Sequence, residues 1–217
     1  MELGKSVYKN TKGQTVLHLN GRKLTVVPHG VTEMVYVEVL NLELNELTEL
    51  PKSISQIKNL KELRLTLNKL TELPDSIGEL INLSCLKVSC NRLSAIPSSI
   101  ANLKKLQELD LRNNKLRELP EDITVLKELT VLNLNCNLLS GLPRHIKRLR
   151  KLKKLYLSHN RLRELPTELE DLEDLQMLKV NGNNLTSKAM RNLRKLMKEK
   201  GISGMPNSYC KLALLYL

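Results

Sequence analysis

Aliphatic, asparagine and proline positions recur along the chain with a period of 23 residues. The asparagines of this series are Asn45, Asn68, Asn91, Asn114, Asn137, Asn160 and Asn183. The prolines keep the same period independently, at Pro28, Pro51, Pro74, Pro97, Pro120, Pro143 and Pro166. One period before Asn45 stands Arg22, so eight units share a single frame. A period of this length is typical of stacked repeats, in which each unit packs only on its neighbours.

Two aliphatic columns in every unit predict a β-sheet. The first column is Leu17, Leu40, Leu63, Leu86, Leu109, Leu132, Leu155 and Leu178. The second follows two residues later, from Leu19 to Val180. This alternation predicts a short strand in each unit, with both apolar side chains on one face. Stacking then places about eight short strands side by side, parallel and about 4.8 Å apart.

The remaining columns predict a turn and an outer wall. An asparagine amide both donates and accepts hydrogen bonds, so it can satisfy backbone groups that a turn would otherwise bury unpaired. The proline fixes its own φ and keeps the preceding residue extended. Three residues after each proline comes an aliphatic residue, as in Ile54 and Ile77. We expect this segment to form a short helical turn or an irregular run on the convex side.

The two ends depart from the repeat, as the ends of a solenoid must. Residues 1–13 are polar and are predicted to form an N-terminal cap that pairs with the first strand. Residues 14–186 form the eight repeats, and residues 187–217 form a C-terminal cap and tail. Thr186 and Ser187 precede a helix expected over about 188–200, with Gly201 as its stop. For the apolar segment 210–217, packing on that helix and exposure both stay open.

The best-formed unit runs from Leu106 to Ile123 with the sequence LQELDLRNNKLRELPEDI. It resembles the leucine-rich repeat of intracellular signalling scaffolds, above all the Ras-group and Scribble-type proteins, over about residues 14–186. The resemblance implies an α/β solenoid, a right-handed horseshoe with a concave parallel sheet. Short helical turns and irregular segments would form its convex face, and a capping helix its C-terminal end. It also implies binding of proteins on the concave sheet, often in small-GTPase, phosphatase or polarity pathways.

Composition and cysteine usage favour a reduced, intracellular setting. Cys85, Cys90, Cys136 and Cys210 form no CxxC pair and do not cluster at an end of the repeat array. No run of about 18 apolar residues is present, so we expect no membrane span. The first residues, MELGKSVYKN, lack an apolar stretch of signal-peptide length. We therefore expect a cytoplasmic protein.

The outward positions of the predicted strands are mostly polar, which leaves one face of the sheet open. Parallel sheets are usually covered on both faces, so an open face is suited to docking. Tyr and Arg are favoured interface anchors, and Leu44 and Leu67 are neighbours that would form an apolar spot. The predicted partner-binding residues are Asn41, Glu43, Leu44, Arg64, Leu67, Lys87, Asp110, Arg112, Asn133, Tyr156 and His159.

An alternative hypothesis uses charge, since the chain has a formal net charge of +12. A dense basic run comprises Arg144, Lys147, Arg148, Arg150, Lys151, Lys153 and Lys154. Such a patch can attract anionic membrane surfaces or nucleic acid. Most of the run is expected on the convex side, with Lys153 and Lys154 bordering the sheet, and a solvated convex face is the simpler interpretation. Nucleic acid is not expected, because single strands favour interleaved aromatic residues and only Tyr156 is near.

Motifs for catalysis are absent from the sequence. It contains no GxxxxGK[ST], no GxSxG and no HExxH. Cys136 and His159 occupy equivalent positions in adjacent units and could form a nucleophile or half a metal site. Neither an oxyanion donor nor a third ligand accompanies them. We expect no enzyme activity, no metal and no cofactor, and an unidentified protein as partner, such as a small GTPase or another signalling protein.

Overall fold

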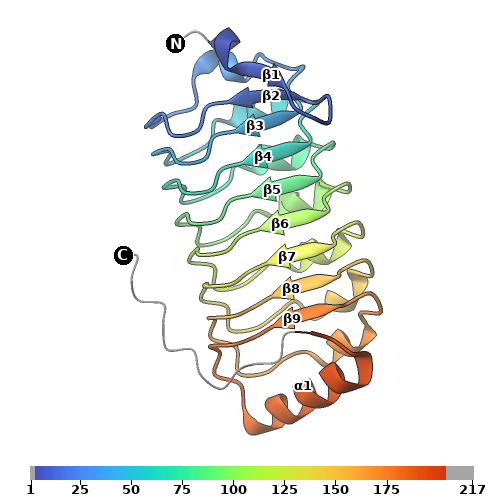
Figure 1. The fold of residues 1–217 in the computed structure, drawn as a ribbon. Helices are drawn as coiled ribbons and strands as arrows, with labels where there is room; N and C mark the ends of the chain where they lie inside the picture. The colour runs from blue at the N-terminus through green and yellow to red at the C-terminus, as the bar shows by residue number, and fades with distance from the viewer. Residues whose placement is uncertain (1–2, 204–217) are drawn as a thin grey trace.

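The computed structural model describes residues 3–203, which form one ladder of stacked repeats (Figure 1). A single sheet of nine strands runs along the ladder, and each strand lies next to its neighbour in sequence. The strands are β1 (Val7–Lys9), β2 (Thr15–His18), β3 (Val39–Asn41), β4 (Glu62–Arg64), β5 (Cys85–Lys87), β6 (Glu108–Asp110), β7 (Val131–Asn133), β8 (Lys154–Tyr156) and β9 (Met177–Lys179). The predicted solenoid is therefore confirmed, with one strand more than the eight repeats supply.

Strands β2 to β9 are parallel, and their register follows the repeat without a slip. Leu40 lies opposite Leu63, and Leu109 lies opposite Leu132. The strands are shorter than the alternation predicts, because each one ends before the second leucine of its unit. The backbone ladder nevertheless continues there, since Leu42 N donates to Arg64 O at 2.9 Å. The second leucine thus belongs to the start of the turn rather than to the strand.

Short 3-10 helical turns form the opposite side of the ladder, as the sequence predicts. They are η2 (His29–Val31), η3 (Lys52–Gln56), η4 (Asp75–Glu79), η5 (Ser98–Asn102), η6 (Glu121–Val125), η7 (Ile146–Arg148) and η8 (Thr167–Asp171), whereas η1 (Leu3–Ser6) precedes β1 at the N-terminal end. Most begin directly after the proline, whose backbone is extended; Pro51 has φ −67° and ψ 144°. The proline carbonyl then accepts the first hydrogen bond of the turn, from Ile54 N at 3.0 Å. A buried aliphatic residue of each turn from η2 to η8 closes the core; it is Val31 in η2, Leu169 in η8 and isoleucine in the others.

The asparagine column lies inside the ladder and ties consecutive repeats together. Asn114 is only 8% exposed. Its Nδ2 donates to Val88 O and Leu111 O, both at 3.0 Å, and its Oδ1 accepts from Leu93 N at 3.0 Å. The other asparagines of the column repeat this pattern, as Asn137 does towards Leu111 O at 3.0 Å. The predicted role of the amide in satisfying turn backbone is confirmed, and the bonds cross from one repeat to the next.

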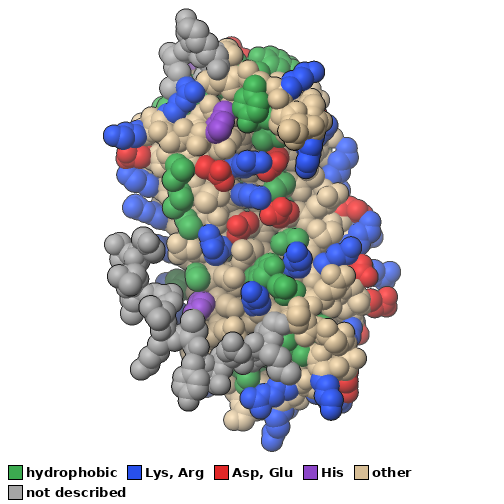
Figure 2. Space-filling model, in the orientation of Figure 1, with side chains coloured by type: hydrophobic (Ala, Val, Ile, Leu, Met, Phe, Trp, Pro, Cys, Tyr) green, Lys and Arg blue, Asp and Glu red, His purple; other side chains and the backbone are tan. Residues whose placement is uncertain are grey.

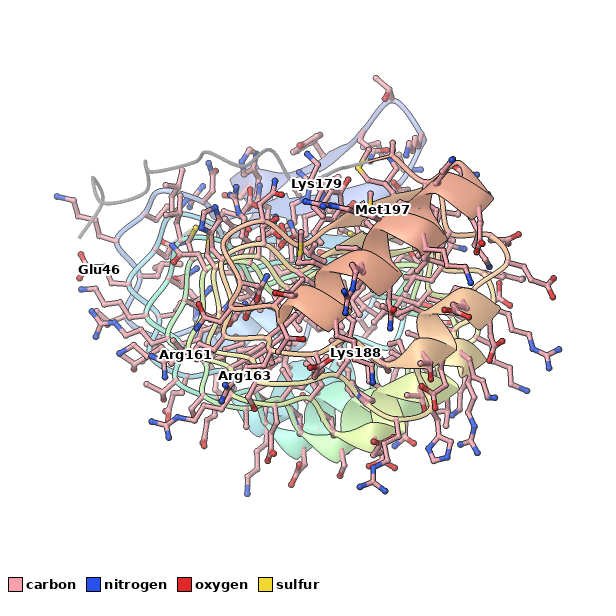
Figure 3. All side chains as sticks on the ribbon, turned by 90° about the horizontal axis from the view of Figure 1, so that it is seen from below. Glu46, Arg161, Arg163, Lys179, Lys188 and Met197 are labelled. Atoms are coloured by element: carbon pink, nitrogen blue, oxygen red, sulfur yellow. The ribbon has the colours of Figure 1, made fainter. Side chains whose placement is uncertain are left out.

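Different elements cover the two ends. At the N-terminus, β1 pairs antiparallel with β2, with Val7 opposite Leu17. At the C-terminus, helix α1 (Ser187–Lys200) lies across the last repeat, with Lys188 near its start and Met197 near its end (Figure 3). Thr186 caps the helix by accepting from Ala189 N at 3.2 Å, and Gly201 ends it with φ 63°.

The chain returns to the sheet after α1. Ser203 forms a parallel bridge with Met177, and its carbonyl accepts from Leu178 N at 3.0 Å. The segment 210–217 lies outside the described residues, so both alternatives for it stay predictions. No helix within residues 3–203 has the length and apolar character to cross a membrane.

Candidate functional site

The outward side chains of the strands form the open surface that we call the sheet face. The register places one predicted column in a continuous line: His18, Asn41, Arg64, Lys87, Asp110, Asn133, Tyr156 and Lys179. Arg64, Lys87 and Asp110 therefore lie on consecutive strands, as do Asn133 and Tyr156. The structure brings these predicted residues together on one surface.

A further outward column, before the first leucine of each unit, was not predicted from the sequence. It lies at the first residue of most strands and comprises Val16, Val39, Glu62, Cys85, Glu108, Val131, Lys154 and Met177. The period-two alternation carried the signal, because a residue two positions before an outward residue points to the same face. Lys154, predicted to border the sheet as part of the basic run, belongs to this column. The column matters because it supplies the acidic residues that contact the predicted basic anchors.

Charges in the middle of the sheet face are paired within the chain. Arg64 Nε lies 2.6 Å from Glu62 Oε1, and Lys87 Nζ lies 3.3 Å from Glu108 Oε1. The hydrogen bond to Glu62 raises the pKa of the Arg64 guanidinium. Partly exposed pairs of this kind contribute only about 0–1 kcal/mol to stability. Figure 2 shows acidic and basic side chains interleaved over the middle strands, so this region presents little net charge.

The thiol in the centre of this charged region is held protonated. Burial raises the pKa of Cys85 to about 12, and the carboxylates of Glu108 and Glu62 act in the same direction. Burial also raises the pKa of Cys136. A thiol attacks as its thiolate, so neither residue is activated as a nucleophile. Within residues 3–203 no group of three His, Cys, Asp or Glu side chains could hold a metal ion.

Several polar side chains of the sheet face are used by the turn that follows the strand. Asn41 is 7% exposed, and its Oδ1 accepts from Glu43 N at 3.0 Å. Asp110 accepts from Arg112 N at 3.0 Å in the same way. Such contacts stabilise turns. Asn41 was predicted to bind a partner, but its burial assigns it to the fold, whereas Arg112 is exposed.

The residue before each core asparagine adopts a left-handed backbone conformation. The column comprises Leu44, Leu67, Cys90, Asn113, Cys136, His159 and Gly182, with φ between 54° and 68°. Glycine and asparagine tolerate this region, whereas leucine is strained in it. Leu44 and Leu67 are nevertheless 55% and 48% exposed. Leu44 and Leu67 therefore form the exposed apolar spot predicted from the sequence, and the left-handed backbone conformation there is unfavourable for leucine.

The fold divides the predicted basic run between the convex side and the sheet face, and acidic side chains neutralise part of its charge. Lys147 Nζ lies 3.3 Å from Asp171, and Lys151 Nζ lies 2.7 Å from Glu128. Arg148 and Arg150 line a shallow hollow together with Lys147, Asp171 and Glu173. Lys154 lies on the sheet face instead. Counter-charges inside the hollow reduce its attraction for an anionic surface, which disfavours the electrostatic alternative.

A family model described as a leucine-rich repeat region matches residues 15–114, and two models described as leucine-rich repeats match residues 105–126 and 127–185. The chain is a leucine-rich-repeat protein. Proteins of this class are generally protein-interaction modules. The finer resemblance to Ras-group and Scribble-type proteins stays a prediction.

Solved structures of other leucine-rich-repeat proteins share the fold. A leucine-rich-repeat protein of Leptospira interrogans is 35% identical, with a TM-score of 0.71 over 78% of this chain and 49% of its own. An internalin from Listeria monocytogenes is 23% identical, with a TM-score of 0.75 over 84% of this chain and 52% of its own. Internalin C2 from the same species is 20% identical, with a TM-score of 0.73 over 83% and 76%.

The similarity covers only part of the longer solved structures. The present leucine-rich-repeat chain spans about half the length of the Leptospira protein and of the first internalin. The two internalins show the fold alone at their level of identity. No curated protein sequence matches the chain.

Proposed function

We propose that the chain is a non-catalytic module that binds a partner protein on its sheet face. The observation that carries this proposal is the exposed leucine pair, Leu44 and Leu67, on a left-handed backbone. An L-residue in this conformation costs about 1–2 kcal/mol. Asn113 and Gly182 show that the same column accepts residues for which that cost is reduced or absent. About half of each leucine is left exposed to water, and a partner that covers this apolar surface would gain binding energy.

The rest of the sheet face supports the same proposal. Arg112 is exposed, and Arg64 on β4 and Tyr156 on β8 are half-buried on the same surface. Arg and Tyr are enriched among residues that dominate binding energy. We also propose that the partner is a signalling protein, such as a small GTPase, in the cytoplasm. The resemblance of the unit 106–123 to signalling scaffolds supports a signalling partner. The free thiols of Cys85, Cys90 and Cys136 support a location in the cytoplasm.

Replacing both leucines is expected to separate binding from stability. In the variant Leu44→Asn/Leu67→Asn, relief of backbone strain should raise the free energy of unfolding by about 1–2 kcal/mol. Loss of the apolar contact should weaken partner binding at least about tenfold. The partner is captured with the chain as bait, purified and titrated by calorimetry, and stability is measured by urea denaturation.

The matched control is Ile81→Asn, because Ile81 is 58% exposed but lies outside the sheet face and outside the left-handed column. This control should leave the affinity unchanged. A double variant that binds as tightly as the wild type would contradict the proposal. Loss of stability together with binding would also contradict it, since the leucines would then serve the fold.

A further inference from the structure

We infer that the partner segment bound on the sheet face is acidic where it meets the last two repeats. This inference rests on the proposed function and adds the chemistry of the partner. The surface concerned comprises Lys154 and Tyr156 of β8 with Met177 and Lys179 of β9, and we call it the cationic end. It differs in charge from the rest of the sheet face.

The side chains of the cationic end form one compact group. The register places Lys154 opposite Met177 and Tyr156 opposite Lys179. Lys179 Nζ lies 5.8 Å from the centre of the Tyr156 ring. A cation over an aromatic face is weakly attracted to it, which holds the ammonium group beside the ring. Lys179 lies on the sheet side of the ladder in Figure 3, away from Arg161 and Arg163 on the turn edge.

Charge separates this end from the middle of the sheet face. In the middle strands, Arg64 and Lys87 each contact a glutamate. Among residues 3–203 no carboxylate forms an ion pair with Lys154 or Lys179, and both lysines are exposed. The outward columns of β7, β8 and β9 contain no acidic residue. Within the part of the chain that the structure describes, two cations therefore stand beside a tyrosine and a methionine without a counter-charge, a setting that suits a carboxylate flanked by apolar groups.

A protein segment fits this charge pattern better than a nucleic acid does. A polyanion gains affinity by neutralising many phosphates along its length. Along the sheet face it would meet Glu62, Glu108 and Asp110 after the cationic end. Like charges placed opposite one another disfavour a partner. A peptide can carry acidic residues at one end only and avoid this repulsion.

The spacing of the two binding features sets the length of the segment. The cationic end begins at β8, and Leu44 belongs to the repeat of β3, five strand intervals away. At about 4.8 Å per interval this distance is about 24 Å. A helix of about 16 residues or an extended segment of about 7 residues covers it. The inferred ligand is thus a peptide with apolar side chains at one end and carboxylates at the other.

Selection from a random peptide library tests this inference with the full chain. Displayed peptides of about 16 residues are selected on the wild type and, separately, on Lys154→Glu/Lys179→Glu. We expect Asp and Glu to be enriched in the first pool and Lys and Arg in the second. Synthetic peptides from the first pool should bind the charge-reversed variant at least about tenfold more weakly. The control is Lys104→Glu/Lys127→Glu, which makes the same change of net charge at two exposed lysines outside the sheet face.

The outcomes distinguish this inference from the proposed function. A wild-type pool without acidic enrichment overturns the inference, as do peptides that bind the charge-reversed variant and the control equally well. Peptides that depend on Leu44 and Leu67 but lack acidic residues overturn the inference alone. A pool in which no peptide depends on any residue of the sheet face overturns the proposed function as well. Matching thermal unfolding of all variants excludes loss of folding as the cause.

Discussion

Replacing Asn114 with alanine is expected to lower the free energy of unfolding by about 3–5 kcal/mol. The amide lies in the middle of the ladder. Its hydrogen bonds to Val88 O and from Leu93 N join it to the preceding repeat, and the bond to Leu111 O holds the turn of its own repeat. Val88 O and Leu111 O would each keep a second amide donor, from Asn91 and Asn137 respectively. Leu93 N would lose its partner altogether, and an unsatisfied buried N–H costs about 1–3 kcal/mol. The two weakened carbonyls and the space left by the amide add the remainder.

Urea denaturation followed by circular dichroism measures this loss. The neighbouring residue provides the control, because Asn113 is exposed and its left-handed backbone suits glycine. Asn113→Gly should therefore shift the unfolding midpoint very little. An Asn114→Ala chain as stable as Asn113→Gly would show that the asparagine column does not hold the repeats together.

Adding one methyl group at Gly78 is expected to cost about 1–3 kcal/mol. A Cβ at this position would lie 2.3 Å from Ser99 O and 2.9 Å from Ser99 C, both backbone atoms of the next repeat. Backbone atoms cannot rotate away as a side chain can, so η4 and η5 would have to separate. Because repeats are stabilised by contact with their neighbours, the disturbance should lower the stability of the whole ladder.

The equivalent residue of the preceding repeat is the control for Gly78→Ala. Ser55 already carries a Cβ, and Ser55→Ala removes only the hydrogen bond from its hydroxyl to Lys52 O at 3.2 Å. This control should lose at most about 1 kcal/mol. If Gly78→Ala unfolded at the same urea concentration as the wild type, the close approach between the two repeats would not constrain the fold.

The fold was predictable because the same residue pattern recurs in every repeat. Each unit places Leu, Asn, Pro and an aliphatic residue at the same offsets, so one interpretation accounts for all of them. The helix at 187–200 followed from a cap at Thr186 and a stop at Gly201. Contacts between repeats were not predictable in the same way. The repeat frame places Gly78 at the same offset as Ser55 and Ala101, and the close approach to the backbone of Ser99 becomes visible only in the structure.

The surface was predicted in part, for a related reason. Alternation identified the outward columns that hold Arg64 and Arg112, and it could have identified the further column that holds Glu62 and Glu108. It could not show that Asn41 is buried and bonded to its own turn, since both depend on backbone geometry. The left-handed conformation at Leu44 and Leu67 also has no signal in their residue type, which argues against it. These strained leucines are where local preference and structure disagree, and such disagreements concentrate at functional sites.

The affinity of the purified partner for three forms of the chain tests the central claim most directly. The forms are the wild type, the sheet-face variant Arg64→Ala/Arg112→Ala/Tyr156→Ala and the variant Arg148→Ala/Arg150→Ala of the basic run, at low and physiological salt. We expect the sheet-face variant to bind about 100-fold more weakly and the basic-run variant to bind like the wild type at both salt concentrations. A sheet-face variant with unchanged affinity, alongside binding that disappears with salt or in the basic-run variant, would contradict the account.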